Sequence, residues 1–80
     1  TSNVLVFPNP TSKVINIQAF GNHKIATNIY NQLGSLVYSN TFKNISSRII
    51  SIPVVEFPKG IYFIEVLNDN VVSTHKVVVR

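Results

Sequence analysis

Apolar and polar residues alternate along most of this chain, and the alternation predicts short β-strands. The strongest run follows a corner at residues 58–60, where Pro58 ends the preceding segment and Gly60 supplies backbone freedom. One face of this run is apolar and is expected in the core: Tyr62, Ile64 and Val66. The segments 48–55 and 71–80 on either side are also extended and apolar, so we expect this strand to be central in its sheet.

The rest of the chain repeats this pattern between turn residues. Further strands are expected at 4–7, 13–19, 24–31, 36–42, 48–52 and 71–80. Turns are expected where Pro, Gly, Asn and polar residues gather, at 8–12, 20–23, 31–34, 43–47 and 68–70. About seven short strands, with turns roughly every 8 to 12 residues, predict an all-β sandwich or a small open barrel.

Composition argues against catalysis. A chain of 80 residues forms one domain with a single core and little room for a deep active-site cavity. There is no cysteine, and three carboxylates in all leave little material for acid–base chemistry. The two histidines, His23 and His75, have no acidic neighbour at the spacing of metal ligands. We therefore expect no enzyme activity, no metal and no cofactor.

The charge pattern narrows the choice of partners. The formal net charge is +4, but the cations are spread singly along the chain and no stacking aromatic residues alternate with them. A nucleic-acid groove would need both features, so we expect no nucleic-acid partner. No apolar run reaches the roughly 20 residues that span a bilayer. No secretory leader opens these residues, so a leader for export is expected upstream of them.

Five blocks of sequence, in order, resemble the type A C-terminal sorting domain of the Bacteroidota type IX secretion system. They are FPNPTS at 7–12, VINI at 14–17, IYNQLG at 29–34 with Val37, FPKGIYFI at 57–64 and THKVVV at 74–79. The resemblance extends from Val4 to Arg80. The residues of these motifs that shape turns or the core are Pro8, Asn9, Pro10, Gly34, Gly60 and Tyr62.

The resemblance implies a fold and a function. The implied fold is a seven-stranded, immunoglobulin-like antiparallel β-sandwich, with residues 1–80 as a single domain behind a covalently fused upstream cargo. The precursor would cross the inner membrane, pass through the periplasm and be recognised by the outer-membrane translocon. A sortase-type peptidase would then remove the domain, leaving the cargo at the cell surface or secreted. The resemblance implies that the domain acts as a sorting signal and has no catalytic activity.

Two departures from the family pattern concern loops. Asn31 stands where the family often has Asp, which keeps the turn propensity and removes a charge. Between Ile52 and Gly60 the family usually has a shorter segment containing a Leu. Phe57 takes the place of that Leu here, after about two extra residues, and Pro53 stands where Ser or Asp is common. We expect a bulged loop in this segment, with the fold retained.

The segment from Lys76 to Arg80 has two interpretations. As an ordinary last strand, it would direct Val77 and Val79 inward and leave Lys76 and Arg80 in solvent. As a recognition element, it would be read by the translocon through main-chain pairing at a sheet edge, aided by the two cations. The resemblance favours recognition of Lys76, Val77, Val78, Val79 and Arg80. Deletion of residues 77–80 is then expected to abolish export and to leave most of the sandwich folded.

Other interpretations remain open. The corner at Pro8, Asn9 and Pro10 is expected to shape the first turn, and Tyr62 to be a core aromatic whose hydroxyl has a partner. A carbohydrate- or protein-binding immunoglobulin-like module is the alternative function. It would need an exposed aromatic platform, to which Tyr30, Tyr38 and Phe42 would contribute. A structural linker is a further alternative, and exposed edge strands make a weak homodimer conceivable.

Overall fold

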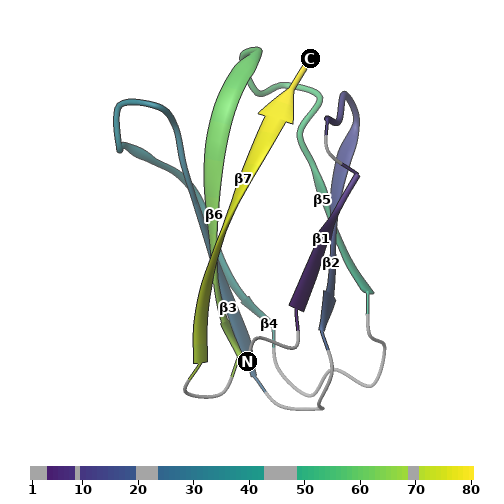
Figure 1. Cartoon of the computed structure of the whole chain (residues 1–80), viewed down its shortest axis with the longest axis vertical. Coiled ribbons are helices and arrows are strands. Elements are labelled where there is room, and N and C mark those ends of the chain that lie inside the picture. Colours follow the sequence, from purple (N-terminus) through teal and green to yellow (C-terminus); the bar gives the residue numbers. More distant parts are fainter. Residues whose placement is uncertain (1–3, 9, 20–23, 43–48, 69–70) are drawn as a thin grey trace.

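The computed structural model describes residues 4–8, 10–19, 24–42, 49–68 and 71–80. Within these ranges the regular structure is entirely β-strand, arranged in two facing sheets (Figure 1). The strands are β1 (Val4–Phe7), β2 (Val14–Ala19), β3 (Ile25–Tyr30), β4 (Leu36–Phe42), β5 (Ile49–Pro53), β6 (Gly60–Asn68) and β7 (Val71–Val79). The described part of the chain has no helix long and apolar enough to cross a membrane.

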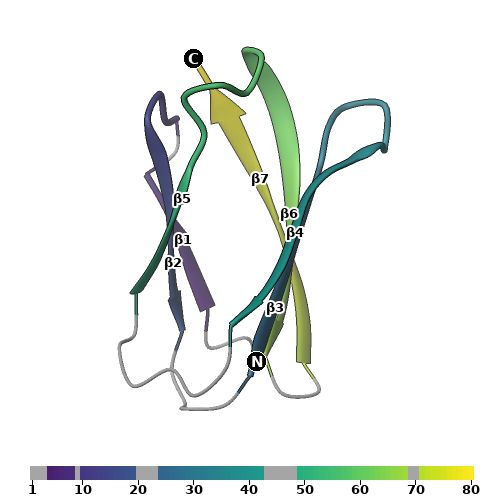
Figure 2. The same ribbon diagram turned by 180° about the vertical axis from the view of Figure 1, so that it is seen from behind.

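The two sheets have an immunoglobulin-type topology. One sheet has three strands in the order β1-β2-β5, and the other has four in the order β4-β3-β6-β7, with all neighbours antiparallel. Lettered in chain order as A, B, C, C′, E, F and G, the strands form an ABE sheet facing a C′CFG sheet. Figure 2 shows β4 at the edge of the larger sheet. The predicted seven-stranded antiparallel β-sandwich is confirmed.

The position of β6 is partly as predicted. β6 is an inner strand, but its neighbours are β3 and β7, and β5 pairs with β2 in the opposite sheet. The chain crosses between sheets after β4 and again after β5. Proximity in sequence therefore identified only one of the two neighbours of β6.

The core lies between the inner faces of the two sheets. Its residues are mostly β-branched, alternate along each strand and are almost fully buried: Val4, Ile15, Ile17, Ile25, Ile29, Ile50, Ile52, Val54, Tyr62, Ile64, Val66, Val77 and Val79. Full burial of one such side chain stabilises a fold by about 1.5–3 kcal/mol relative to exposure. The chain has no cysteine, so this apolar layer is not reinforced by disulfides.

The loops that the structure describes agree with the predicted turns. In the segment between β5 and β6, the Phe57 N–H donates to the Val54 carbonyl at 3.0 Å, and the Phe57 ring packs against the core. The longer segment therefore forms a turn and the fold is retained, as expected. The turns predicted at 20–23 and 43–47, and residues 69–70 of the last hairpin, lie outside the described residues.

One polar side chain interrupts the core. Thr27, on β3, is fully buried, and its Oγ1 is the one buried side-chain nitrogen or oxygen in the described ranges that has no hydrogen-bond partner. A buried hydroxyl without a partner carries a desolvation cost of about 1–3 kcal/mol. Valine has nearly the same shape and carries no such group.

We predict that Thr27→Val raises the free energy of unfolding by about 1 kcal/mol, because it removes this unpaired hydroxyl. Urea denaturation measures the change. Thr74→Val, the same substitution at an exposed position of β7, is the matched control and is expected to stay within about 0.5 kcal/mol of the wild type. A destabilised Thr27→Val variant would show instead that the hydroxyl is satisfied in solution.

Candidate recognition surface at the end of the last strand

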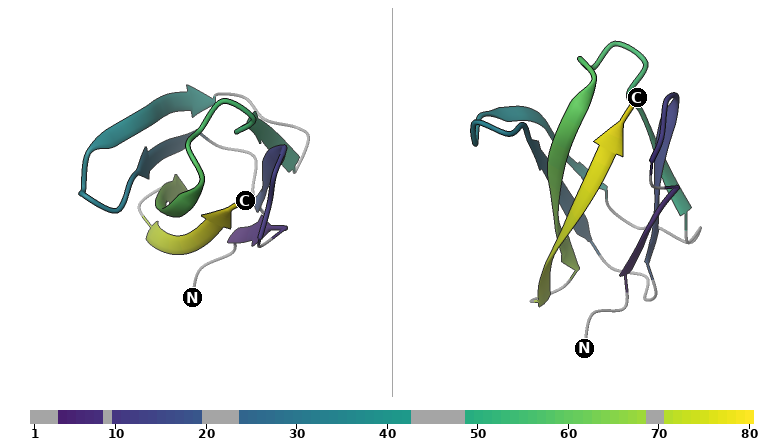
Figure 3. Two further views of the ribbon diagram at one scale, coloured as in Figure 1. Left: turned by 90° about the horizontal axis from the view of Figure 1, so that it is seen from above. Right: turned by 45° about the horizontal axis from the view of Figure 1, so that its top comes forward.

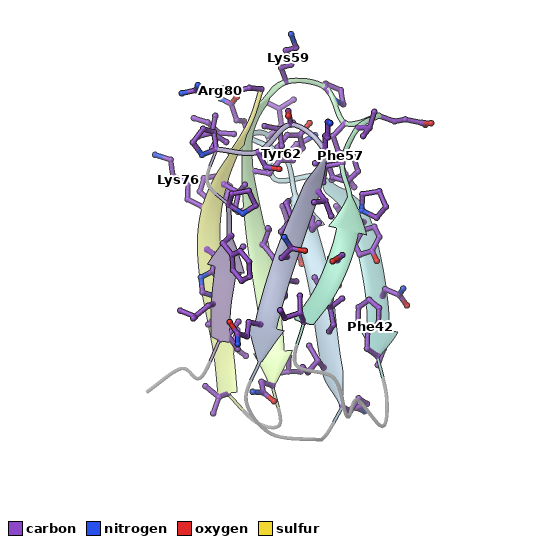
Figure 4. The ribbon with its side chains drawn as sticks, turned by 90° about the vertical axis from the view of Figure 1, so that its right-hand side faces the viewer. Phe42, Phe57, Lys59, Tyr62, Lys76 and Arg80 are labelled. Carbon is purple, nitrogen blue, oxygen red and sulfur yellow. The ribbon has the colours of Figure 1, made fainter. Side chains whose placement is uncertain are left out.

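The last strand contributes to both the core and the surface. β7 pairs with β6 along its whole length, from Val71 opposite Asn68 to Val79 opposite Gly60. Val77 and Val79 are buried, whereas Lys76 and Arg80 are exposed. Figure 4 shows both cationic side chains at the upper end of the sandwich, directed away from the core. The inward and outward residues are therefore those predicted from the alternation.

The outer edge of β7 is closed at this end by residue 11. The Thr11 N–H donates to the Val78 carbonyl at 2.9 Å, and the Arg80 N–H donates to the Thr11 carbonyl at 2.8 Å. These bonds form a parallel bridge between Thr11 and Val79, where the tip of β7 meets the link between β1 and β2 (Figure 3). Thr11 is itself buried, and its Oγ1 donates to the Val14 carbonyl at 2.6 Å.

This closure concerns the predicted pairing of a partner with the main chain of residues 76–80, which stays a prediction. The Val78 carbonyl and the Arg80 N–H already have partners in the same chain. A second strand could add there only by displacing Thr11, which would expose that buried residue and break both bonds. Main-chain pairing of a partner with Val78 and Arg80 would therefore compete with these bonds.

The deletion expected to spare the fold would damage it. Residues 77–80 include the two core side chains Val77 and Val79, and their removal also removes both backbone bonds to Thr11. Two buried valines contribute about 3–6 kcal/mol together. A small domain has roughly 5–15 kcal/mol of stability in total. Loss of export in such a deletion would therefore report unfolding as readily as lost recognition.

The corner before β6 is fastened to the core by an aromatic pair. Tyr62 is buried, and its hydroxyl donates to the Pro58 carbonyl. Its ring lies against Phe57, with the centroids 5.4 Å apart and the planes tilted by 48°. The prediction of a core aromatic whose hydroxyl has a partner is confirmed. Figure 4 shows Phe57 and Tyr62 just below the exposed Lys59.

Both glycines of the motif occupy positive-φ positions. Gly60 has a φ of +152°, and a Cβ there would lie 3.3 Å from Oε1 of Gln32. The same oxygen accepts from the Ile61 N–H at 3.5 Å, so the hairpin between β3 and β4 contacts the corner before β6. Gly34, with a φ of +86°, supplies the left-handed position of that hairpin.

Asn31 builds the hairpin through its side chain. Its Oδ1 accepts from the N–H groups of Leu33 at 2.9 Å and Ser35 at 3.0 Å, and its carbonyl accepts from the Gly34 N–H at 3.0 Å. An aspartate would offer the same acceptor oxygen. The departure from the family at this position therefore keeps the turn.

The corner at Pro8 and Pro10 leads to Thr11. Both prolines are exposed, the Phe7–Pro8 peptide bond is cis, and Asn9 lies outside the described residues. Sequence reasoning missed the role of Thr11. No local signal could have found it, because its partners Val78 and Arg80 come from the other end of the chain.

Positive charge collects at the end of the sandwich where β7 ends. Lys59, Lys76 and Arg80 lie there in Figure 4, and the backbone of Lys13 is joined to the same end by the Val54 N–H, which donates to its carbonyl at 2.9 Å. The one acidic residue described in the adjoining loop is Glu56. Cations that are scattered in the sequence are therefore gathered by the fold.

The predicted aromatic platform is not formed. Tyr38 and Phe42 pack against the core, and Tyr30 is on the opposite face of the sheet. Tyr38 and Phe42 lie opposite the buried Ile29 and Ile25 of β3, which places them on the inner face of the sheet. The most exposed aromatic side chains described are instead Phe7 and Phe63. This arrangement removes the feature on which the binding-module alternative depended.

His75 is half-buried on β7. Its Nε2 lies 3.0 Å from the Ser73 hydroxyl oxygen, and burial lowers the pKa of the imidazole from its ordinary 6.5. No group of three or more metal-ligating side chains occurs in the described ranges. His23 lies outside them.

Comparison with protein families decides the identity of this chain. The model of the secretion system C-terminal sorting domain matches residues 5–80. The chain belongs to this family, the type IX secretion C-terminal sorting domain. No curated protein matches it. The sorting domain is thus a signal for export across the outer membrane, and its family is one of sorting signals and not of enzymes.

We predict that the sorting domain loses stability as the pH falls through about 6.5, because the unfolded chain then binds a proton at residue 75 that the native state resists. The loss levels off once the pH is below the lowered native pKa. The free energy of unfolding, measured between pH 7.5 and 5.5, is compared in the wild type and His75→Gln. His23 is present in both proteins, so its contribution cancels. Equal pH slopes would contradict the prediction.

Proposed function

We propose that residues 1–80 act as one domain that the outer-membrane translocon recognises after the precursor has reached the periplasm. The observation that carries the proposal is the match to the sorting family over residues 5–80, combined with exposed Lys76 and Arg80 at the end of β7. The two buried valines of the same strand hold these cations in place. A folded domain is therefore what the translocon meets.

Recognition uses side chains in this proposal. The Val78 carbonyl and the Arg80 N–H are bonded to Thr11. Lys76, Arg80 and the half-buried Val78 remain presented to a partner as side chains, while Val77 and Val79 act indirectly by packing. Charge complementarity at such a surface would speed encounter and favour one partner over others.

The two ends of the sandwich would have different tasks. β1 begins at the end opposite to the one where β7 terminates (Figure 1). A cargo fused upstream would therefore join the domain away from the cationic end and would leave that end accessible. We infer that a sortase-type peptidase then cuts at or before Thr1, and that the cargo is released or held at the surface. The domain itself performs no catalysis and needs no cofactor or nucleic acid.

We also infer a weak homodimer through β4. β4 has one strand neighbour, β3, among the described strands, so its other edge is open to pairing. Sedimentation of the isolated domain at increasing concentration would detect this association. It plays no part in export as proposed.

The export proposal is tested by fusing residues 1–80 to the C-terminus of a periplasm-targeted fluorescent reporter in a bacterium with a type IX system. We expect the reporter outside wild-type cells and inside cells that lack the translocon. Retention in both strains, with the domain shown to be folded by circular dichroism, would overturn the proposal.

Charge reversal then separates recognition from folding. We predict that Lys76→Glu and Arg80→Glu each reduce export of the fusion by about tenfold, equivalent to about 1.4 kcal/mol of lost recognition. Both residues are exposed, so the melting temperature is expected to change little. The matched control is Lys24→Glu, the same exposed charge change beside the start of β3 at the other end of the sandwich. Equal export of all three variants would refute the role of the cationic end.

A further inference from the structure

We propose that the outer face of the four-stranded sheet is a docking surface for a protein partner that is apolar at its centre and acidic at its margin. This inference rests on the proposed function and names the kind of surface that the translocon component presents. The docking surface, called here the outer-face patch, consists of side chains from all four strands: Tyr30, Leu36, Ile61, Phe63 and Val78, with Lys76 at its margin.

Strand register brings these residues together. Phe63 of β6 lies opposite Tyr30 of β3 on one side and opposite Lys76 of β7 on the other. Tyr30 in turn lies opposite Leu36 of β4, so a single row crosses the sheet. Residues directly opposite in an antiparallel pair share a face and have neighbouring side chains. Ile61 and Val78 form a second pair, beside this row and closer to the end of β7.

The outer-face patch exposes large apolar side chains to solvent. Leu36 is 54% exposed and Phe63 is 38% exposed. This face packs against no other element described here, so folding does not require apolar side chains at these positions. A contiguous apolar surface with a charged margin is typical of a protein-binding site.

A polar row limits the patch on the side away from the end of β7. The Ser39 hydroxyl donates to Asn28 Oδ1 at 2.7 Å, and Asn28 Nδ2 donates to Glu65 Oε1 at 3.0 Å, which joins β4, β3 and β6. Beyond this row lie Leu67 and Val72, opposite one another on β6 and β7. The apolar surface is thereby divided in two, and one part adjoins the cationic end.

Charge determines the chemistry of the partner. Lys76 is the last residue of the row on edge strand β7, and Lys59 and Arg80 lie at the same end of the molecule (Figure 4). The nearest acidic side chain on this face, Glu65, is in the polar row and accepts a hydrogen bond from Asn28. A complementary protein surface therefore carries carboxylates opposite these cations.

The shape of the patch favours a protein over a lipid bilayer. An element that binds at a lipid surface buries its apolar face about 5–10 Å into the boundary between headgroups and acyl chains. Tyr30, Ile61 and Val78 are instead half-buried within the sheet face, which suits a flat contact. A second copy of the domain would bring the same net charge of +4 towards itself. Both alternatives are outcomes of the test below.

The first experiment places a charge in the patch. In the exported reporter fusion, Phe63→Asp is compared with Val72→Asp, an equally drastic change on the same face beyond the polar row. We expect Phe63→Asp to reduce export at least about tenfold and Val72→Asp to reduce it less than about twofold. Melting of both isolated variants shows that each is folded. Failure of the wild-type fusion to leave the cell would defeat the proposed function, whereas normal export of folded Phe63→Asp defeats only this inference.

The second experiment tests whether the partner places a carboxylate next to Lys76. A carbodiimide joins a lysine amine to a carboxylate only when the two are in contact. Applied to cells exporting the wild-type fusion, it is expected to couple the domain to a translocon protein, and mass spectrometry should find the bond at Lys76 and an Asp or Glu. Lys76→Arg keeps the charge and export but cannot be coupled, so this adduct is lost.

Three results would overturn the inference. One is a coupled carboxylate that belongs to another copy of the domain, with a dimer in sedimentation that Phe63→Asp abolishes. Another is binding of the isolated domain to vesicles containing phosphatidylglycerol that depends on Phe63 and Lys76. The third is efficient export without any translocon adduct at Lys76.

Discussion

The fold depends on burial of two alternating apolar faces against each other. With no disulfide and no helix in the described ranges, the layer of isoleucines and valines between the sheets is the main stabilising contribution. The last strand supplies Val77 and Val79 to this layer. The same two valines therefore stabilise the sandwich and fix the position of the surface cations beside them. Changes to residues 76–80 therefore affect the stability of the whole sandwich as well as its surface.

The hydrogen bonds between Thr11 and β7 also affect both the fold and the surface of the domain. By bonding to Val78 and Arg80, Thr11 connects the two sheets and satisfies the edge of the last strand. Edge strands with unsatisfied backbone groups pair indiscriminately with other chains. A domain with such protection is less prone to pair its last strand with the wrong chain.

Local pattern predicted much of this structure, and topology explains the remainder. Alternation located all seven strands, and it placed Tyr62, Ile64 and Val66 in the core, because a strand's two faces differ within a few residues. Pairing between segments that are distant in the sequence produces no comparable local pattern of residues. The sheet that receives β5, the closure by Thr11 and the gathering of Lys59 with Arg80 all depend on how the strands are ordered in space. The inward positions of Tyr38 and Phe42 follow from their pairing with the buried Ile29 and Ile25 of β3.

The place of β7 in the chain gives the domain a further property. Within this domain, the strand that completes the core is the last of the seven strands to be synthesised. A nascent chain that stops early lacks Val77 and Val79, so its earlier strands have no complete apolar layer on which to close. Truncation within β7 therefore acts on the whole sandwich, because a chain that lacks these two valines cannot complete the apolar layer between the sheets.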